Sequence, residues 1–449
     1  MRYNIPAGAI QIIQKLKKNG HKAYLVGGCV RDLLMGREPH DWDICTSALP
    51  EQMKVCFGQH KTIETGLKHG TLTVVLGDQP YEVTTFRVDG TYSDGRHPDE
   101  VAFTSDLDED LARRDFTINA IAMNEDGFTY DPYGGIGDIA HMIIECVGDP
   151  VERFNEDGLR IMRALRFSST LDSRISYRTA REMHRYKENL RKVSVERIAA
   201  ELMKLLTGLT PGLDIRGFHD ILSVFWPEIE ACVGFDQKNR HHVYDVWTHI
   251  CVAIDKVDTD DVIVRLTLLL HDIGKPKCFT VDEQGRGHFY GHPPICATMA
   301  DDMLRRLKFD NDTRTKVVQL VEHHDATIVP TEKCARRWLN KLGEEQFERL
   351  LAVKIGDILA HNPDTIGDRA NDIYRTREVL KEVLAKQQCF SFKDLAVNGK
   401  DVIDAGVPQG PEVGKILREI LDRVIDGELS NERTLLIDAI IHIKEELHL

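Results

Sequence analysis

The chain has 449 residues, 42% of them hydrophobic, which is enough to bury the cores of two to four domains. No apolar run approaches the length of a membrane span, since the longest candidate, Val262 to Leu270, is short and interrupted by Arg265. The N-terminus lacks the apolar core of a signal peptide, so the sequence predicts a soluble, cytoplasmic protein without a membrane partner.

Ten cysteines occur without any Cys-x-x-Cys pair, which argues against a zinc ribbon and for reduced, packed thiols. The formal net charge of −14 is unfavourable for an RNA-binding protein, because phosphate contacts dominate such affinity. Between Val151 and Leu206, however, 13 Lys and Arg stand against 8 Asp and Glu, a local net charge of +5. A basic groove on an acidic body is therefore compatible with this composition.

The first predicted elements lead to a glycine turn. Ala7 to Lys18 has the spacing of an amphipathic helix, and Tyr24 to Val26 reads as the end of a strand. The turn at Gly27-Gly28 follows, and a helix begins directly after it. A glycine pair lets the backbone approach a ligand, and the N–H groups of a helix N-terminus suit a phosphate. Arg31 can add a bidentate contact, so Gly28 and Arg31 are candidate nucleotide-binding residues.

Two aspartates follow the glycine turn. Asp41 and Asp43 stand two apart in a predicted strand, so both side chains should point to one face. Adjacent carboxylates repel unless a cation lies between them, and oxygen ligands favour Mg²⁺, which takes one or two carboxylates plus substrate phosphates. Alone, a Gly-Gly turn is weak evidence, and an Asp-x-Asp pair usually marks a solvated strand end. Together they describe a phosphate cradle beside a metal pair.

The stretch from Leu25 to Ser47 resembles motif A of the class II nucleotidyltransferases, which comprise the tRNA CCA-adding enzymes and the bacterial poly(A) polymerases. The resemblance implies a catalytic head with a mixed β-sheet. It also implies that Asp41 and Asp43 are the catalytic residues and hold two Mg²⁺ ions during nucleotidyl transfer.

The predicted head continues with a helix and two strands. Ser47 to Gln52 reads as a helix start with a proline in its first turn. Gly70 to Leu76 and Tyr81 to Arg87 look like strands joined by a turn. Glu82, in the second strand, is either a third acidic group facing the metal site or an ordinary edge carboxylate.

Two later segments of the head also resemble parts of this family. Asp89 to Pro98 is rich in turn formers and reads as a mobile loop, placed like the loop that assists the switch from C to A addition. Arg113 to Ala120 is predicted to open a helix that resembles motif B. Its arginine pair could be a solvated face, but Asp115 and Asn119 lie one helical turn apart. We assign Arg114 to nucleotide binding.

Asn155 to Phe167 is predicted to be a partly buried helix. One aspartate and three arginines recur along it at every third residue: Asp157, Arg160, Arg163 and Arg166. Such a run is usually a salt-bridge ladder on a solvated face. The alternative is base recognition, because an Asp acceptor and an Arg donor match the amino group and ring nitrogen shared by cytosine and adenine. The stretch resembles motif D, which implies that all four residues bind the nucleotide.

The second half of the chain is predicted to be entirely helical. Asp261 to Leu270 reads as an apolar helix that ends in His271-Asp272, with Gly274 as its stop. An isolated His-Asp dipeptide is normally a capped helix end with a satisfied core histidine. Here further histidines and one aspartate accompany it in the chain: His249, His292, His323-His324 and Asp357.

This order resembles the metal-dependent HD phosphohydrolase domain. The resemblance implies a divalent ion on His249, His271, Asp272 and Asp357. Imidazoles with carboxylates suit a transition metal such as Mn²⁺ or Ni²⁺ more than Mg²⁺. The implied reaction is hydrolysis of a phosphoester, such as a 2′,3′-cyclic end or a 2′-phosphate on RNA.

From Phe390 onward the sequence reads as a turn followed by helices. It resembles the tail of Gram-positive-type CCA-adding enzymes, which grips the tRNA elbow. The alternative is a plain helical packing or dimerisation module. The basic candidates for an RNA contact are Lys415, Arg418 and Arg423.

The predicted fold class is α+β and multidomain: a nucleotidyltransferase head with a mixed sheet (1–146), an all-helical neck for base recognition (147–210), a helical body with the HD domain (211–370) and a helical tail (371–449). The resemblance implies template-independent addition of C, C and A to tRNA from CTP and ATP, with contacts to the acceptor stem and elbow. A poly(A) polymerase and an enzyme adding only CC or only A remain open. So do an HD phosphohydrolase with a vestigial head and a non-catalytic RNA-binding module.

Overall fold

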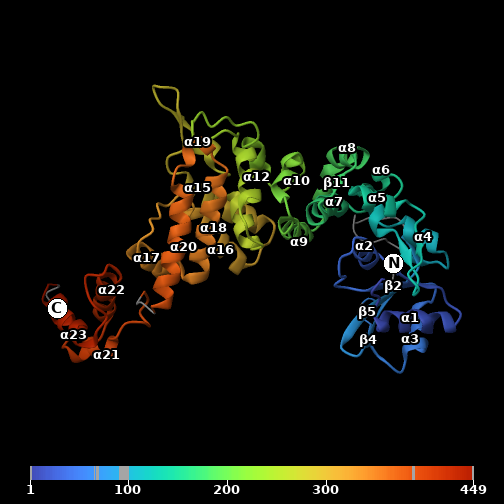
Figure 1. The fold of residues 1–449 in the computed structure, drawn as a ribbon, viewed down its shortest axis with the longest axis horizontal. Helices are drawn as coiled ribbons and strands as arrows, with labels where there is room; N and C mark the ends of the chain where they lie inside the picture. The colour runs from blue at the N-terminus through green and yellow to red at the C-terminus, as the bar shows by residue number, and fades with distance from the viewer. Residues whose placement is uncertain (1–2, 65, 67–69, 90–100, 387–389, 447–449) are drawn as a thin grey trace. The chain divides into compact units, whose positions relative to one another are not determined.

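The computed structural model describes residues 3–64, 66, 70–89, 101–386 and 390–446 (Figure 1). The chain divides into two compact units: Met1–Glu230 with Arg306–Phe309, and Ala231–Arg305 with Asp310–Leu449. The expected loop from Asp89 to Pro98 lies, apart from its first residue, outside the described residues.

The first unit begins with a mixed sheet. Within the described residues its seven strands lie in the order β3-β4-β5-β2-β1-β8-β9. The strands are β1 (Ala23–Val26), β2 (Asp43–Thr46), β3 (Lys61–Ile63), β4 (Thr71–Leu76), β5 (Gln79–Thr85), β8 (Ala122–Met123) and β9 (Thr129–Tyr130). Strands β2 and β5 pair in parallel, whereas the other neighbours are antiparallel. The mixed sheet confirms the prediction for the head.

Helices cover both faces of this sheet. On one face lie α1 (Ala7–Lys18), which has the predicted bounds, and α3 (Pro50–Phe57), which starts at the predicted proline. Ile12 and Phe57 from these helices pack with Leu25 of the sheet, and each such buried side chain contributes about 1.5–3 kcal/mol. The other face is covered by α4 (Leu107–Ala112). The remaining elements are α2 (Gly28–Leu34), α5 (Gly135–His141), β6 (Arg87–Asp89) with β7 (Val101–Phe103), and β10 (Ile143–Ile144) with β11 (Arg174–Ile175).

Two expectations for the head are wrong in local structure. Asp41 does not lie in a strand, since β2 begins at Asp43 and Asp41 belongs to the preceding bend. Residues 113–120 do not open a helix, because α4 ends before them and they contain only the 3₁₀ turn η2 (Thr117–Asn119). Phe116 instead forms an isolated β-bridge with Cys146, which holds this segment extended.

The second half of the first unit is helical, apart from the short strand β11. Its elements are α6 (Pro150–Glu156), α7 (Leu159–Leu171), α8 (Tyr177–Tyr186), η3 (Lys187–Lys192), α9 (Val195–Leu206), α10 (Pro211–Arg216), α11 (His219–Leu222) and η4 (Pro227–Ala231). Helices α7 and α9 pack against each other.

The predicted helix from Asn155 to Phe167 is confirmed from Leu159 onward, but its start is wrong, because the chain breaks at Asp157 between α6 and α7. This residue is extended (φ −140°, ψ 106°), and its carboxylate accepts a hydrogen bond from the backbone N–H of Leu159. At Gly158 the backbone packs so closely on the carbonyl oxygen of Asn189 that a Cβ would lie 2.6 Å from it. The break therefore follows from a tertiary contact and not from local helix preference.

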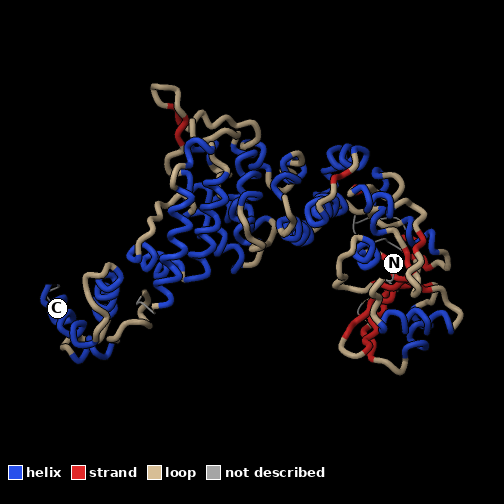
Figure 2. Tube along the Cα trace, in the orientation of Figure 1, coloured by secondary structure: helices blue, strands red, loops and turns tan. Residues whose placement is uncertain are grey.

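The second unit begins with a helical body, and Figure 2 shows that strands are concentrated in the first unit. The helices are α12 (Val246–Lys256), α13 (Val262–Leu270), α14 (Lys275–Cys278), α15 (His292–Arg306), α16 (Asn311–His323), α17 (Glu332–Leu342), α18 (Glu344–Leu359), α19 (Pro363–Ile366) and α20 (Arg369–Ala385). Helix α18 is central, because α12, α13, α16, α17 and α20 all pack against it.

Two expectations for the body are wrong in detail. Helix α13 ends at Leu270, and Gly274 is the residue before α14 instead of the stop of α13. Its φ of −92° is not the left-handed conformation of a glycine stop. The body is also not entirely helical, since β12 (Thr280–Val281) and β13 (Gly287–His288) form a hairpin.

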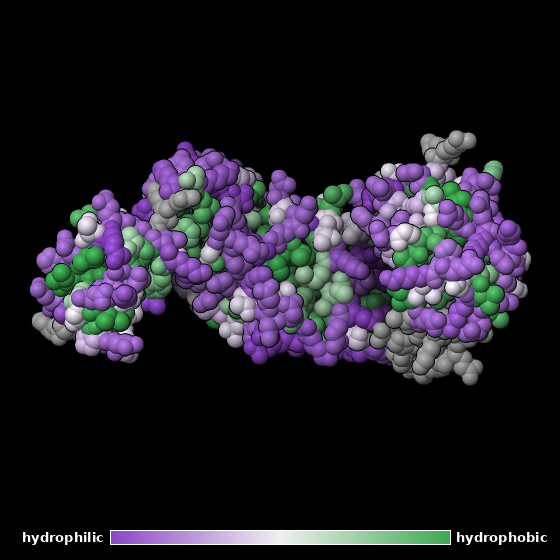
Figure 3. Space-filling model, turned by 90° about the horizontal axis from the view of Figure 1, so that it is seen from below, coloured by the Kyte–Doolittle hydropathy of each residue, from purple (hydrophilic) through white to green (hydrophobic). Residues whose placement is uncertain are grey.

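The last part of the second unit has its own small core. It is formed by α21 (Gly399–Asp404), α22 (Pro411–Ile425) and α23 (Arg433–Glu446), with Ile416, Ile420 and Ile440 buried among them. The molecular face in Figure 3 is mostly hydrophilic, and its hydrophobic residues form separate patches. None of the described helices has the length and apolar character needed to cross a membrane.

Candidate active site and metal centre

The glycine turn of the head lies directly against charged side chains. Gly27 has φ +79°, which an L side chain rarely adopts, and it precedes α2. A Cβ at this position would lie 3.2 Å from Nη1 of Arg114 and 3.5 Å from Oδ2 of Asp43. The glycine therefore keeps open the space between the predicted nucleotide-binding arginine and the predicted metal ligand.

Asp43 borders this space, and two further carboxylates lie near Asp43. The parallel register of β2 and β5 places Asp43 beside Glu82, and Asp41 lies exposed in the bend just before β2. Burial and the charges of Glu82 and Asp41 raise the pKa of Asp43, Arg114 opposes them, and the resulting pKa is about 6. A cation would stabilise the ionised form of Asp43. These side chains offer only oxygen ligands, which suits a divalent metal ion. Glu82 is therefore a neighbour of Asp43, and its role toward a metal ion stays a prediction.

Arg31 connects the glycine turn to the motif B segment. Its Nη1 donates to Oδ1 of Asn119 at 2.9 Å, and its other nitrogens donate to Asp32. Asn119 in turn donates to Asp115 at 3.1 Å, so these two residues are in contact as their spacing predicted, although no helix joins them. Arg31 therefore lies one hydrogen bond from Asn119, which contacts Asp115 of the arginine-rich pocket described next.

Beside Arg114 the first unit has a cavity of about 250 Å³. It is lined by arginines, aspartates and one leucine from three separate segments: Arg113, Arg114, Asp115, Asp157, Leu159, Arg160, Arg163 and Arg197. Four of the predicted nucleotide-binding residues thus line one pocket, and Nη1 of Arg114 borders the same space at Gly27 as Oδ2 of Asp43. Arg166 lies outside this lining, over the ring of Phe167 and 2.7 Å from Glu201.

The polar groups of this pocket are held by ion pairs. Arg163 donates twice to Oδ2 of Asp115, at 2.8 and 2.5 Å. Although burial raises the pKa of Asp115, the charge of Arg163 and further hydrogen bonds hold it well below its usual value. Asp115 is therefore ionised, and it fixes the orientation of Arg163.

Asp157 and Arg160 line the pocket but do not pair with each other in the way the salt-bridge ladder required. Asp157 accepts a hydrogen bond from Arg197 at 2.8 Å. Arg160 donates to Glu156 at 2.5 Å and to the carbonyl oxygens of Arg153 and Arg113. These bonds use three of the five N–H groups of a guanidinium, so Arg160 is fixed and still retains donors.

Sequence reasoning missed Arg197 as a pocket residue. It lies on α9, 40 residues after the aspartate that it binds, and no local motif surrounds it. The only signal was the local excess of basic residues between Val151 and Leu206, which includes it.

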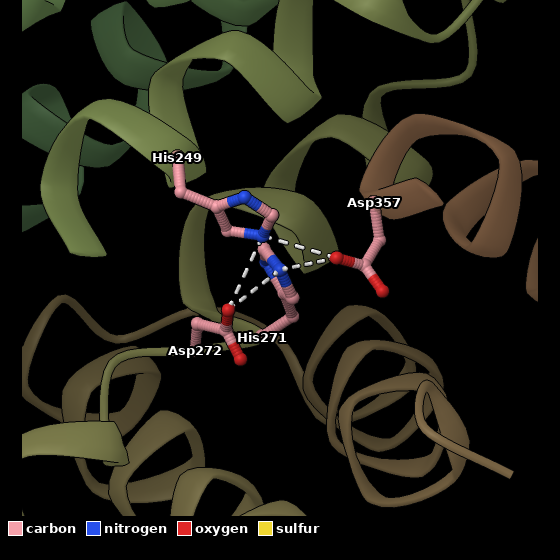
Figure 4. Close-up of side chains that lie close together, drawn as sticks. All are labelled: His249, His271, Asp272 and Asp357. Atoms are coloured by element: carbon pink, nitrogen blue, oxygen red, sulfur yellow. Dashed lines mark hydrogen bonds and ion pairs between the residues drawn. The ribbon is translucent and has the colours of Figure 1, made fainter. Parts of the chain in front are cut away.

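A second cluster of ionisable side chains lies in the body. His249 of α12, His271 and Asp272 after α13, and Asp357 of α18 point toward one another, with one ligand atom of each within 4.8 Å of the others (Figure 4). Nε2 of His249 lies 3.0 Å from Asp357 and 3.3 Å from Asp272. Nε2 of His271 lies 3.3 Å from Asp272.

A second group shares Asp272 with the first. It adds His292 and His324, whose Nε2 atoms are 3.1 Å apart and lie 3.5 and 3.7 Å from Oδ1 of Asp272. Of the pair His323-His324, only His324 belongs to this group, since His323 packs on the ring of Trp338.

All four histidines are oriented in the same way. Their Nδ1 atoms face backbone carbonyl oxygens, for example Leu268 at 2.6 Å from His271 and Val321 at 2.7 Å from His324. A proton on Nδ1 donates to that oxygen and leaves the lone pair of Nε2 facing the cluster, as in histidines that bind metals. This shared orientation makes the cluster a donor set for a cation.

The buried atoms of this cluster lack ordinary partners. In the described part of the chain, neither oxygen of Asp272 accepts a well-formed hydrogen bond, although Nζ of Lys275 lies 2.6 Å from Oδ2. Burial lowers the pKa of His271, but Asp272 and Asp357 outweigh it and raise that pKa to about 10. His271 thus retains a proton, which supplies the positive charge that a metal ion would supply in its place. The residues of the cluster therefore fit such an ion.

The fold and these sites define a nucleotidyltransferase head joined to helical domains. The family profile of the Poly A polymerase head domain matches residues 23–145, and that of tRNA nucleotidyltransferase domain 2 matches residues 295–440. Enzymes of this class use divalent metal ions, in agreement with the carboxylates of the head.

Whole-chain relatives identify the family more closely. The CCA-adding enzyme of Levilactobacillus brevis is 36% identical over 439 residues, or 96% of each chain, and that of Lactobacillus delbrueckii subsp. bulgaricus is 35% identical over 95% of each. The chain therefore belongs to the family of CCA-adding enzymes.

Solved structures agree with this assignment. The Bacillus stearothermophilus CCA-adding enzyme in complex with CTP aligns with a TM-score of 0.73 and 31% identity over 98% of both chains. The Thermotoga maritima enzyme complexed with tRNA aligns with a TM-score of 0.63 at 18% identity, which supports the fold alone.

Proposed function

We propose that the protein adds C, C and A to the 3′ end of tRNA, using CTP and ATP. The observation that carries this proposal is the position of Arg114, which lines the arginine-rich pocket and, together with Asp43, borders the space at Gly27. A triphosphate held by such arginines has its reacting phosphate near the carboxylates. The family supports the same reaction, and the Bacillus stearothermophilus relative was solved with CTP. A tRNA substrate also favours a cytoplasmic location.

Asp41 and Asp43 are proposed to hold two Mg²⁺ ions, with Glu82 beside them. When bound, Mg²⁺ would lower the pKa of the ribose hydroxyl and stabilise charge on the departing diphosphate. The residues of the chain orient the substrates: Gly28, Arg31, Arg114, Arg163 and Arg166 are the proposed nucleotide contacts.

Asp157 and Arg160 are proposed to select the base. The Asp157 carboxylate can accept from the exocyclic amino group of cytosine or adenine, and the remaining N–H groups of Arg160 can donate to the adjacent ring nitrogen. Guanine and uracil present a carbonyl in place of that amino group. The mismatch leaves buried polar groups unpaired, at a cost of about 1–3 kcal/mol each. Arg197 fixes the Asp157 carboxylate and belongs to this selection.

The test is a transfer assay on tRNA lacking its CCA end, supplied with each nucleotide singly and in combination. We expect two residues from CTP alone and three from CTP with ATP. Extension by ATP alone into a long tract would indicate a poly(A) polymerase. A stop after two residues with both nucleotides would indicate a CC-adding enzyme.

The body supports a second function, metal-dependent phosphoester hydrolysis. His249, His271, Asp272 and Asp357 are the proposed ligands, and the common Nδ1 orientation of the histidines supports a transition metal such as Mn²⁺ or Ni²⁺. His292 and His324 give Asp272 a second set of neighbours, so the cluster has donors for two ions. Such an ion would supply a reactive hydroxide at neutral pH.

This second function is tested with purified protein, added Mn²⁺ or Ni²⁺, and RNA ending in a 2′,3′-cyclic phosphate or carrying a 2′-phosphate. We expect release that depends on the metal and on His271. Absence of product from both substrates would exclude the activity.

The four-part division into head (1–146), neck (147–210), body (211–370) and tail (371–449) is also proposed. The small core of helices α21, α22 and α23 supports a separate tail. We propose that this tail contacts the tRNA elbow.

A further inference from the structure

A cavity of about 340 Å³ lies between the end of α18, the start of α20 and the segment after α16. Ile358 and Ile373 form its apolar part, and Lys354, Arg369 and Asp325 are among its polar groups. The volume falls at the lower end of the range for small-molecule sites. None of the proposed metal ligands lines this cavity, so it is distinct from the metal centre.

Neither cation of this cavity forms an ion pair with a carboxylate in the described part of the chain, although the charges of Asp357 and Asp325 act on Lys354. Nζ of Lys354 donates to the backbone oxygen of His324 at 2.9 Å, and no carboxylate among the described residues lies at ion-pair distance from it. Across the same described ranges, the side chain of Arg369 makes no hydrogen bond or ion pair. Nearby cations differ, since Lys275 pairs with Asp272 at 2.6 Å and Arg349 with Asp261 at 2.7 Å. A half-buried lysine without a close ion pair is costly, and an external anion would lower that cost.

The cavity adjoins the proposed metal centre. Lys354 precedes Asp357 by three residues on α18, so the two side chains are neighbours on one helix face. The carbonyl that Lys354 binds belongs to His324, whose imidazole is part of the second donor group. Arg369 is the first residue of α20, where the helix N-terminus adds positive potential.

We propose that this cavity binds a phosphate group of an RNA substrate, next to the phosphoester that is hydrolysed at the metal centre. Lys354 and Arg369 would hold the internucleotide phosphate that precedes the terminal one. The substrate class is then an oligoribonucleotide end and not a free mononucleotide. The role in hydrolysis rests on the proposed second function, whereas phosphate binding by the two cations does not.

The carboxylates of the cavity are compatible with such a ligand. Asp372 lies 3.7 Å from Arg375, which offsets part of its charge, and Asp325 is exposed at the surface. Carboxylates accept hydrogen bonds from ribose hydroxyls. A ribose next to the bound phosphate therefore suits this lining better than a simple inorganic anion.

The kinetic experiment compares two substrates with the same scissile group in the presence of Mn²⁺: adenosine 2′,3′-cyclic phosphate, and the dinucleotide ApA ending in a 2′,3′-cyclic phosphate. We expect kcat/KM to be about tenfold higher for the dinucleotide, because it carries the additional phosphate. Arg369→Gln and Lys354→Gln should each remove this advantage and leave the mononucleotide rate unchanged. Lys381 is an exposed lysine on α20, the helix that begins at Arg369, so Lys381→Gln is the matched control.

A binding experiment separates this inference from the hydrolase proposal. The probe is ApA without a terminal phosphate, titrated into chelator-treated full-length protein. We expect Arg369→Gln to weaken ApA binding about tenfold, and Lys381→Gln to leave it unchanged. If neither cyclic phosphate is hydrolysed but ApA binding depends on Arg369, the hydrolase fails and the phosphate subsite stands. Equal kcat/KM for both substrates, or ApA binding unaffected by Arg369→Gln, overturns the subsite.

Discussion

The head and the body each contain a group of carboxylates suited to a cation, and the pKa shifts of the two groups are opposite. In the head, burial and like charges raise the pKa of Asp43 to about 6. In the body, burial acts in the same direction on Asp272, but His271 and Lys275 reverse it and hold its pKa well below the usual value. The same side chain therefore titrates differently, because the neighbouring positive charges outweigh burial only in the body.

This difference separates the chemistry of the two sites. The head needs an external cation and has only oxygen ligands, which suits Mg²⁺ arriving with a triphosphate. The body has preoriented imidazoles that can retain a transition metal between turnovers. A chain with both groups can thus be expected to divide its metals between the two reactions.

The largest expected effect comes from removing the head carboxylates. Asp41→Ala combined with Asp43→Ala should lower CMP incorporation into CCA-less tRNA by about 10³-fold or more, because the transition state loses its cation sites. Hydrolysis by the body should persist, since the two sites share no residues. If both activities were lost together, the head and the body would not be independent metal sites.

The converse change addresses the body. His271→Ala should lower Mn²⁺-dependent hydrolysis by about 100-fold or more and reduce the bound transition metal, because a ligand with a fixed orientation is lost. Metal content is measured by mass spectrometry of the dialysed protein. His323→Ala is the matched control, since this neighbour of His324 lies outside both donor groups. Retention of metal in His271→Ala would contradict the assignment.

The sequence was sufficient for features that depend on local patterns. The periodicity of Ala7 to Lys18 predicted α1, and the family motifs predicted residues that the structure brings together around one pocket. The features it missed depend on contacts between distant segments. The break at Asp157 requires the close packing of Gly158 on Asn189, and the partner of Asp157 is Arg197 on another helix.

The histidine pair shows the same limit. Sequence order placed both His323 and His324 near the metal site, because adjacent residues cannot be distinguished without the helix orientation. At the end of α16 only His324 turns toward Asp272, and His323 packs on Trp338. The residue types were therefore predictable, but the choice between neighbours depended on packing.

A smaller effect is expected for base selection, which distinguishes the head from a simple phosphate-transfer site. Asp157→Asn should lower the preference for CTP over UTP by about tenfold. The amide can donate to the carbonyl of uracil, which the carboxylate repels, and the substitution also removes the ion pair with Arg197. The measurement is the ratio of kcat/KM for the two nucleotides. Asp172→Asn, at the exposed end of α7, should leave this ratio unchanged. An unchanged ratio in Asp157→Asn would remove Asp157 from selection.

The smallest effect concerns the pH dependence of metal binding in the head, compared with that in the body. Because Asp43 has a pKa of about 6, its proton competes with Mg²⁺ only below that pH, and the apparent Kd for Mg²⁺ should rise about fourfold between pH 7.5 and 5.5. In the body the pKa of His271 is about 10, so a proton competes with the metal throughout this range and the dependence should be steeper. Titration of each site, with the other removed by Asp43→Ala or His271→Ala, measures both slopes. Equal slopes for the two sites would contradict this prediction. They would mean that the proton competing with the metal is held equally strongly in the head and in the body.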